Sequence, residues 1–324
     1  MTAAVRPIRE FELLNRIYAG NRELAERFPG RVRVPPGDDM AAIAADGATV
    51  LAAVDSVVEG RHFRAGTPMA LVGRKAVTRN LSDIAAMAAR PLASLAAVVL
   101  PAGMSADSAE SLFEAVRSTA ARFGCPLVGG DIAVHAAGNA PLVCTVTVLA
   151  TVDHAAGRVV TRSGAQPGDR VYVTGLLGAT MTEDGGGHHL EFEPRLEAAA
   201  ALLGALGSRL HAMIDISDGL GRDASHLAEG SNVRVRIDAA TLPCRAGADW
   251  RAAMRDGEDY ELCFAASGPV PESAAGVRVS AVGAVLPAGG GPLVEVVAAD
   301  GVAIDASSLG WEHAAAGGIS ETQP

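Results

Sequence analysis

Carboxylates recur in this chain where apolar segments end or glycines begin. Asp131 follows Gly129-Gly130 at the end of an apolar stretch, and Asp55 ends the apolar run 50–54. The other acids in such settings are Asp38, Asp39, Asp83, Asp215 and Asp218. Carboxylate oxygens are hard ligands that select magnesium or manganese, and magnesium is commonly shared between a few carboxylates and substrate phosphates. We therefore expect a polynuclear metal site that binds a nucleoside triphosphate through metal bridges.

The glycines before Asp131 favour the same interpretation. A short strand, 127–128, is predicted to run into a turn at Gly129-Gly130, where positive φ angles are allowed and no side chain keeps a phosphate away. The two commonest phosphate loops, G-x-x-x-x-G-K-[ST] and G-x-G-x-x-G, are both missing from the sequence. Phosphate binding is thus expected from acids, metal ions and glycines.

Histidines and cysteines do not indicate a competing site. The four cysteines are far apart and form no C-x-x-C, so neither zinc binding nor a disulfide scaffold is predicted. The adjacent pair His188-His189 lies in a glycine-rich run and lacks the spacing H-E-x-x-H. We interpret these histidines as loop residues.

Composition limits the class of protein. A length of 324 residues favours two domains, and 49% hydrophobic residues can fill two cores. A net charge of -10 argues against nucleic acid or an anionic membrane as the main partner, because both need a basic face. The sequence has no run of 18 apolar residues and no apolar segment before a cleavage site near Met1, so we expect a cytoplasmic protein.

Strand and helix patterns alternate in two halves, and the segment 157–168 is the expected boundary between them. The domains are predicted as 1–152 and 153–324. Helical spacing predicts a long helix that contains Asp83, and Ser217 or Asp218 is the expected cap of another helix. The predicted helices are 10–18, 70–89, 106–123, 194–206 and 220–229. The predicted strands are 40–44, 49–54, 95–100, 127–128, 142–152, 170–174, 233–237, 261–265 and 277–285.

A set of short motifs follows one order along nearly the whole chain. The motifs are 10–14 (EFELL), 37–39 (GDD), Asp55 with 60–63 (GRHF), 80–87 (NLSDIAAM), 129–131 (GGD), 161–169 (TRSGAQPGD), 215–220 (DISDGL), 257–262 (GEDYEL) and 310–313 (GWEH). Each motif alone is weak, but the ordered set resembles thiamine-monophosphate kinase. That family lies in the superfamily of aminoimidazole-ribotide synthetase, selenophosphate synthetase and the hydrogenase-maturation ATPases.

The resemblance implies a reaction and a fold. The γ-phosphoryl group of ATP would move, with magnesium ions, onto the phosphate of thiamine monophosphate to give thiamine diphosphate. The fold would have two α/β domains, each with a mixed sheet covered by helices. Domain 1–152 would bind ATP and magnesium and would form a homodimer through its sheet, and domain 153–324 would complete the active site.

The resemblance also implies roles for single residues. The expected magnesium ligands are Asp39, Asp55, Asp83, Asp131, Asp215 and Asp218, with Asp38 as a neighbour that orients them. Gly130 and Asp131 would border the nucleotide, and Ser217 would offer a hydroxyl or N–H to its phosphates. Arg162 would reach the same phosphates, because its planar fork suits bidentate contact. Asp131 and Arg162 are the expected catalytic residues.

Three residues match the substrate contacts of the family, namely His62, Glu258 and Trp311. An acid can balance the cationic thiamine, and Trp311 can stack on its rings by cation-π attraction. The alternative for Arg162 is a surface residue in a linker.

This sequence departs from the family pattern close to the expected metals. Ala53 and Val54 precede Asp55 where Ser or Thr is usual, Ala88 replaces a usual Gly, and Ile132 replaces a usual Thr. These changes bear on the number of bound metals more than on the reaction type. Two alternatives stay open, another ATP-using enzyme of the superfamily and a non-catalytic magnesium-nucleotide sensor. Against the first, the reactive N-terminal Cys of selenophosphate synthetases has no counterpart, since the first cysteine is Cys125.

Overall fold

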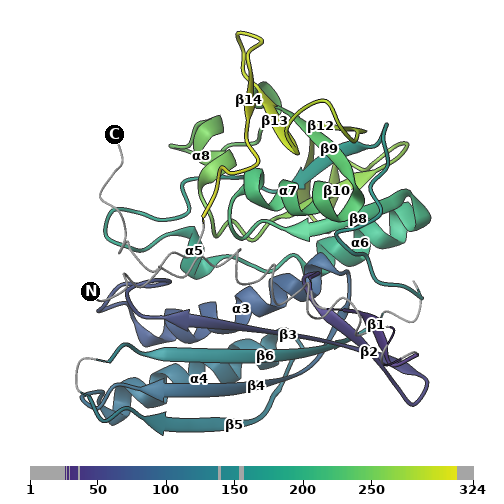
Figure 1. Cartoon of the computed structure of the whole chain (residues 1–324). Coiled ribbons are helices and arrows are strands. Elements are labelled where there is room, and N and C mark those ends of the chain that lie inside the picture. Colours follow the sequence, from purple (N-terminus) through teal and green to yellow (C-terminus); the bar gives the residue numbers. More distant parts are fainter. Residues whose placement is uncertain are drawn as a thin grey trace, which may run out of the picture.

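Two mixed β-sheets with helices packed against them make up the fold (Figure 1). The computed structural model describes residues 26, 28, 30–35, 37–137, 140–152 and 157–311. The first half of the chain supplies one sheet and the second half supplies the other, which confirms the predicted α/β class. The helix expected at 10–18 lies outside the described residues, and the domain boundary at 152 stays a prediction.

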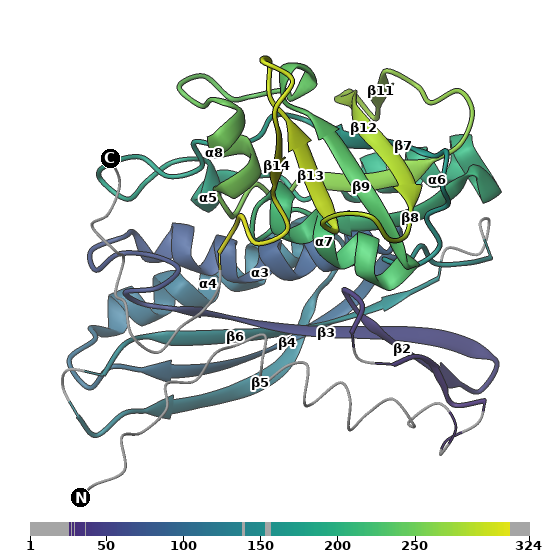
Figure 2. The ribbon, with the colours of Figure 1, turned by 45° about the horizontal axis from the view of Figure 1, so that its top comes forward.

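The first sheet has six strands and helices on one face. Its order is β1 (Val32–Val34), β2 (Ala41–Ala45), β3 (Ala48–Val58), β6 (Val143–Thr151), β4 (Arg90–Leu100) and β5 (Leu127–Val134), and only β4 and β5 run parallel. Helices α3 (Met69–Ala86) and α4 (Ala106–Arg122) cover the same face (Figure 2). Alternation along β3 explains this, since Leu51 and Val57 are buried beneath the helices while Val54 points the other way and is 59% exposed.

The second sheet is covered on both faces. Its order is β14 (Ala303–Asp305), β13 (Val294–Val297), β9 (Val233–Asp238), β12 (Val277–Pro287), β7 (Arg170–Thr174), β10 (Leu262–Ala266) and β8 (Leu210–Asp215), with β11 (Ser273–Ala274) beside β12. Val171 and Val173 join the core that contains α7 (Leu220–Ser231) and α8 (Trp250–Arg255), whereas Tyr172 joins the core that contains α6 (Leu196–Leu206). Burial of both faces accounts for the nearly continuous apolar runs of β7 and β10.

Helix α3 lies between the two halves of the molecule (Figure 2). One face packs on the first sheet, and the other contacts α6, β8 and the short helix α5 (His188–Glu191). The helix therefore buries polar side chains as well as apolar ones, among them Lys75, Asn80 and Ser82. Residues on this second face are placed where both halves of the chain meet.

The end of α3 has a specific geometry. Ala88 has a φ of 48°, its N–H bonds Ala85 O at 2.9 Å, and the N–H of Ala89 bonds Ile84 O at 3.0 Å. This pair of bonds is the Schellman closure, which places the residue after the cap in the left-handed region that glycine favours. Ala88, the residue that departs from the usual glycine, thus occupies a strained position.

Two predicted strands, 49–54 and 127–128, end several residues too early. β3 continues past Asp55 to Val58, because Asp55 stays paired with Val146 of β6 and further β-branched residues follow it. β5 runs through Gly129-Gly130 to Val134, so these glycines form no turn, and neither has a positive φ. Packing accounts for Gly130 instead, since a Cβ there would lie 1.9 Å from Ala96 O.

No helix among the described residues is both long and apolar enough to cross a bilayer.

Candidate active site

Three carboxylates from different parts of the chain meet between the two sheets. Asp39 precedes β2, Asp83 lies on α3, and Asp215 ends β8. One oxygen from each lies within 4.8 Å of the others. We call these three residues the acid cluster. The structure thus brings together three of the six predicted metal ligands.

The acid cluster carries concentrated negative charge. Burial and the neighbouring Asp39 raise the pKa of Asp215 to about 7, although the hydroxyl of Ser82 donates to it at 2.6 Å. The pKa of Asp83 is raised well above its ordinary value by burial and by Asp55 and Asp215. Asp39 Oδ2 is buried and has no hydrogen-bond partner in the described part of the chain. An orphaned oxygen among crowded carboxylates fits a divalent cation with oxygen ligands.

Arg162 is paired with the acid cluster from the segment that leads into the second half. Its Nη2 and Nε donate to Asp39 Oδ1 at 2.6 and 3.2 Å, and its backbone N–H donates to both carboxylate oxygens of Asp38. Burial and the charge of Asp39 raise the pKa of Asp38 to about 6. Arg162 is therefore not the exposed linker residue of the alternative interpretation.

Asp55 lies beside the acid cluster but is paired with an arginine. Arg79 of α3 donates from Nε to Asp55 Oδ2 at 2.8 Å and from Nη1 to Ser56 O at 2.8 Å. Burial disfavours the charged form of Arg79, but Tyr260, Asp55 and other acids outweigh this and raise its pKa.

Asp131 lies apart from these acids within one chain. It is opposite Ala97 of β4, which is opposite Thr145 of β6, which is opposite Ser56 of β3. Three steps between neighbouring strands of about 4.8 Å place it roughly 14 Å from β3. It is exposed on the edge strand β5, as is Gly130.

The loop between β8 and α7 holds Ser217 and Asp218. The expected cap by either side chain is wrong, because Gly219 is the cap residue and Asp223 Oδ2 accepts from the N–H groups of Asp218 and Gly219 at 3.0 and 3.1 Å. Asp223 thus closes the loop from inside the helix, and burial together with Asp218 raises its pKa well above the ordinary value. The N–H of Trp311 donates to Asp218 O at 2.8 Å, which holds the half-exposed Trp311 beside this loop.

Glu258 forms a buried network with α3. Its Oε1 accepts from Lys75 Nζ at 2.6 Å, and its Oε2 lies 3.0 Å from His189 Nδ1. Lys75 Nζ also donates to His62 O at 2.6 Å and lies 2.9 Å from His189 Nδ1. Burial alone would raise the pKa of Glu258, but Lys75 and His189 bring it to about 2. Two of the three predicted substrate contacts, His62 and Glu258, are therefore joined through Lys75.

The histidine pair is bound to protein groups. His189 Nε2 lies 3.1 Å from Gly185 O, and His188 Nε2 lies 2.9 Å from Asp259 O. The prediction that these histidines are loop residues is wrong, because both lie in helix α5.

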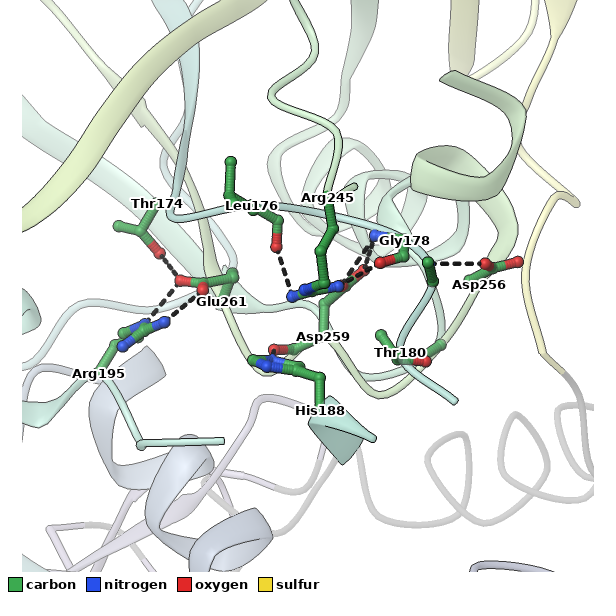
Figure 3. Close-up of polar contacts among 12 residues, drawn as sticks. Thr174, Leu176, Gly178, Thr180, His188, Arg195, Arg245, Asp256, Asp259 and Glu261 are labelled. Carbon is green, nitrogen blue, oxygen red and sulfur yellow. Dashed lines mark hydrogen bonds and ion pairs between the residues drawn. The ribbon is translucent and has the colours of Figure 1, made fainter. Parts of the chain in front are cut away.

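Charged contacts clamp the loop that carries Glu258 (Figure 3). Glu261 accepts from Arg195 at 2.5 and 2.7 Å and from the hydroxyl of Thr174 at 2.7 Å. Asp259 is paired with Arg245 at 3.1 Å, and burial nevertheless raises its pKa to about 8.

Backbone strain is held in the same loop. Glu258 and Tyr260 have φ angles of 64° and 51°, in a region that residues other than glycine rarely adopt. Such angles persist only where surrounding contacts impose them, and they concentrate at functional sites. The contacts of Glu261 and Asp259 therefore fix the direction in which Glu258 points.

Sequence reasoning missed Lys75 and Arg79, the two cations of α3 that pair with Glu258 and Asp55. Lys75, Arg79 and Asp83 follow one another at intervals of four residues, so they lie on one face of α3. Three charged residues spaced by four along a helix with many buried positions are the signal that indicates this face.

Comparisons with known proteins agree with this geometry. A family model described as AIR synthase related protein, N-terminal domain, matches residues 37–152. The thiamine-monophosphate kinase of Rhodopirellula baltica is 33% identical over 282 residues, covering 79% of this chain and 84% of that protein. That of Mycobacterium tuberculosis is 36% identical over 291 residues, covering 81% and 82%. The solved structure of AaThiL complexed with AMPPCP and TMP matches with a TM-score of 0.75 and 26% identity, over 94% of this chain and 97% of that one.

Proposed function

This chain belongs to the thiamine-monophosphate kinase family, and we propose that it transfers the γ-phosphoryl group of ATP to thiamine monophosphate, giving thiamine diphosphate. The observation that carries the proposal is the meeting of Asp39, Asp83 and Asp215 in a chain that matches these kinases over most of its length. Such acids suit the binding of a metal-bound nucleotide.

The acid cluster is the proposed magnesium site. Asp39, Asp83 and Asp215 would hold the metal. The sequence also predicts Asp55, Asp131 and Asp218 as ligands, and of these Asp55 is already paired with Arg79. Bound magnesium would neutralise phosphate charge and orient the transferring group. Support comes from the unpartnered Asp39 Oδ2 and from the raised pKa of Asp215, since both indicate negative charge without enough counter-charge.

Arg162 and Ser217 are proposed to bind the phosphates of ATP. Arg162 already approaches the acid cluster through Asp39, so the γ-phosphate of a bound nucleotide would lie within reach of its remaining N–H groups. The acceptor is itself a phosphate anion and needs little deprotonation near neutral pH. Catalysis would then rest on positioning and charge neutralisation, without a dedicated general base.

The network around Glu258 is the proposed site of the thiamine moiety. His62, Glu258 and Trp311 would contact it, as the family pattern implies. The low pKa of Glu258, about 2, keeps it ionised, and a carboxylate can accept further hydrogen bonds beyond those from Lys75 and His189. The cationic, amino-bearing ligand would supply them.

A homodimer is proposed for the face of the first sheet that no helix covers among the described residues. Large apolar side chains are exposed on this face and on β5, namely Ile43, Val54, Leu95, Val128, Ile132 and Val134. A second copy of the chain would bury them. It would also supply Gly130 and Asp131, which lie far from the acid cluster of their own chain, to the nucleotide site of its partner. A cytoplasmic location stays a prediction from the sequence.

The test is incubation with ATP, magnesium and thiamine monophosphate, followed by separation of the thiamine phosphates. We expect thiamine diphosphate and ADP in equal amounts. Unphosphorylated thiamine is the control acceptor and should give no product. ATP binding without thiamine diphosphate would favour the non-catalytic sensor instead.

A further inference from the structure

Arg79 lies at the junction of the acid cluster and the Glu258 loop. Its guanidinium group is held on β3 by Asp55 Oδ2 and Ser56 O, both at 2.8 Å, and its side chain is 13% exposed. Asp83 follows it by one turn of α3, and Tyr260 and Glu258 face it from the second half of the chain. The cation is therefore fixed among acids that come from both halves.

The contact with Arg79 limits the capacity of Asp55 to bind a metal ion. Oδ2 is occupied by the guanidinium, so only Oδ1 remains for another cation. Among the described residues, the carboxylates that converge closely enough to share an ion are Asp39, Asp83 and Asp215, and Asp55 is not one of them. Arg79 stays charged at any physiological pH, so its guanidinium group occupies the position in which a metal ion would otherwise bind Asp55.

The residue two positions before Asp55 reinforces this arrangement. Ala53 lies on the same face of β3 as Asp55, because side chains alternate along a strand. It packs against the core of the first half and offers no oxygen to a metal. An ion bound to Asp55 would therefore be repelled by the charge of Arg79 and would receive no ligand atom from the side chain of Ala53.

We propose that Arg79 is a built-in cation that takes the place of a divalent ion at Asp55. Asp55 is then withdrawn from the metal ligands, and the acid cluster alone binds metal in the nucleotide-free protein. Nη2 of Arg79 donates no hydrogen bond to any described residue, so it remains available to a phosphate oxygen. The inference deepens the proposed function, since it concerns the same phosphate site.

A purely structural role of Arg79 predicts a different effect of its removal on metal binding. If Arg79 only anchors α3 to β3, its removal would lower stability and leave metal binding unchanged. The number of bound ions therefore separates the two roles, and it can be measured without ATP or thiamine monophosphate. Loss of the proposed kinase activity would not affect this measurement.

The experiment counts Mn²⁺ bound to the nucleotide-free protein by electron paramagnetic resonance of the free ion. For Arg79→Gln we expect one additional Mn²⁺ per chain, or binding about tenfold tighter, because Asp55 is released. The double variant Asp55→Asn/Arg79→Gln should return to the wild-type number and affinity, since it removes the acid and the cation together. Circular dichroism checks that each variant is folded.

Arg74→Gln is the matched control. Arg74 lies on the same helix but is paired with Glu193 at 2.8 Å, away from the acid cluster, so its Mn²⁺ binding should equal that of the wild type. The proposal is overturned if Arg79→Gln binds Mn²⁺ as the wild type does. It is equally overturned if the double variant loses an ion, because Asp55 would then be a ligand in the wild type. If Arg79→Gln fails to fold, Arg79→Met takes its place, with the same expected gain in Mn²⁺ binding and the same result that would overturn the proposal.

Discussion

Lys75 Nζ lies 2.6 Å from Glu258 Oε1, and this ion pair joins the central helix of the first half to a strained loop of the second. The Lys75 side chain has no exposed surface, whereas that of Glu258 is 21% exposed. Burial lowers the pKa of Lys75 despite the attraction of Glu258. Burial would raise the pKa of Glu258, but Lys75 and His189 lower it to about 2. The pair therefore fixes the position of a proposed substrate contact from the opposite half of the molecule.

A double-mutant cycle tests this pair. Lys75→Met and Glu258→Gln should each destabilise the protein by roughly 3 kcal/mol, because each leaves a buried charge without its partner. The double variant should be more stable than the sum predicts by about 1 to 3 kcal/mol. Urea unfolding measures these differences. The exposed pair Arg117 and Glu114 is the control, with coupling below about 1 kcal/mol. Additive effects at Lys75 and Glu258 would contradict the account.

Metal binding should depend on pH. The folded pKa values of Asp38 and Asp215, about 6 and about 7, lie above those of an unfolded chain. Their contribution to stability is therefore present below about pH 4 and lost as pH rises through these values. Because magnesium competes with these protons, its stabilising effect should grow from about pH 5 to about pH 8.

Thermal unfolding with and without magnesium measures this difference at each pH. Asp215→Asn is the control variant, and its magnesium effect should be small at every pH. A magnesium effect in the wild type that is equal at both ends of the pH range would count against the acid cluster as the metal site.

Ala88 should tolerate glycine but not valine. A β-branched residue in the left-handed region is strained and would overpack a buried position, so Ala88→Val should cost about 3 kcal/mol. Ala88→Gly relieves the strain but loses a buried methyl group, and the two effects should cancel to within about 1 kcal/mol. Chemical unfolding compares the two variants. Equal stability of both would mean that Ala88 is not constrained in this way.

The proposed dimer predicts complementation between inactive variants. Asp39→Asn and Asp131→Asn should each abolish turnover while leaving the fold intact. Mixed after dissociation and reassociation, they should recover about a quarter of the wild-type activity, because half of the dimers are mixed and each has one intact site. A mixture of Asp39→Asn with Asp215→Asn is the control and should recover none. If the first mixture also stays inactive while each variant is dimeric, Asp131 does not act across the interface.

Much of the fold could be predicted from sequence because its signals are local. The apolar period of α3 and the apolar run in β3 placed these elements to within a few residues, apart from the strand ends. The extension of β5 through two glycines could not be read locally, because pairing with β4 overrides their low strand propensity. Gly130 illustrates this, since its need for glycine comes from Ala96 on another strand.

The candidate site was predicted less completely. The ordered motifs named Asp39, Asp83 and Asp215, which the structure brings together. They did not indicate that Asp131 lies three strands away, because that separation is set by strand order. Lys75 and Arg79 were missed for a related reason. A charged side chain can be buried on a helix only if an opposite charge offsets the cost of removing it from water, and the partners of these two residues, Glu258 and Asp55, are distant in sequence.

The central claim is direct phosphoryl transfer from ATP to thiamine monophosphate, and transfer of a label tests it most directly. The protein is incubated with magnesium, thiamine monophosphate and ATP labelled in the γ-phosphoryl group, and the thiamine phosphates are then separated. We predict that the label is found in the terminal phosphate of thiamine diphosphate, in an amount equal to the ADP formed. Label that appears only as inorganic phosphate, or that stays in ATP, would contradict the account.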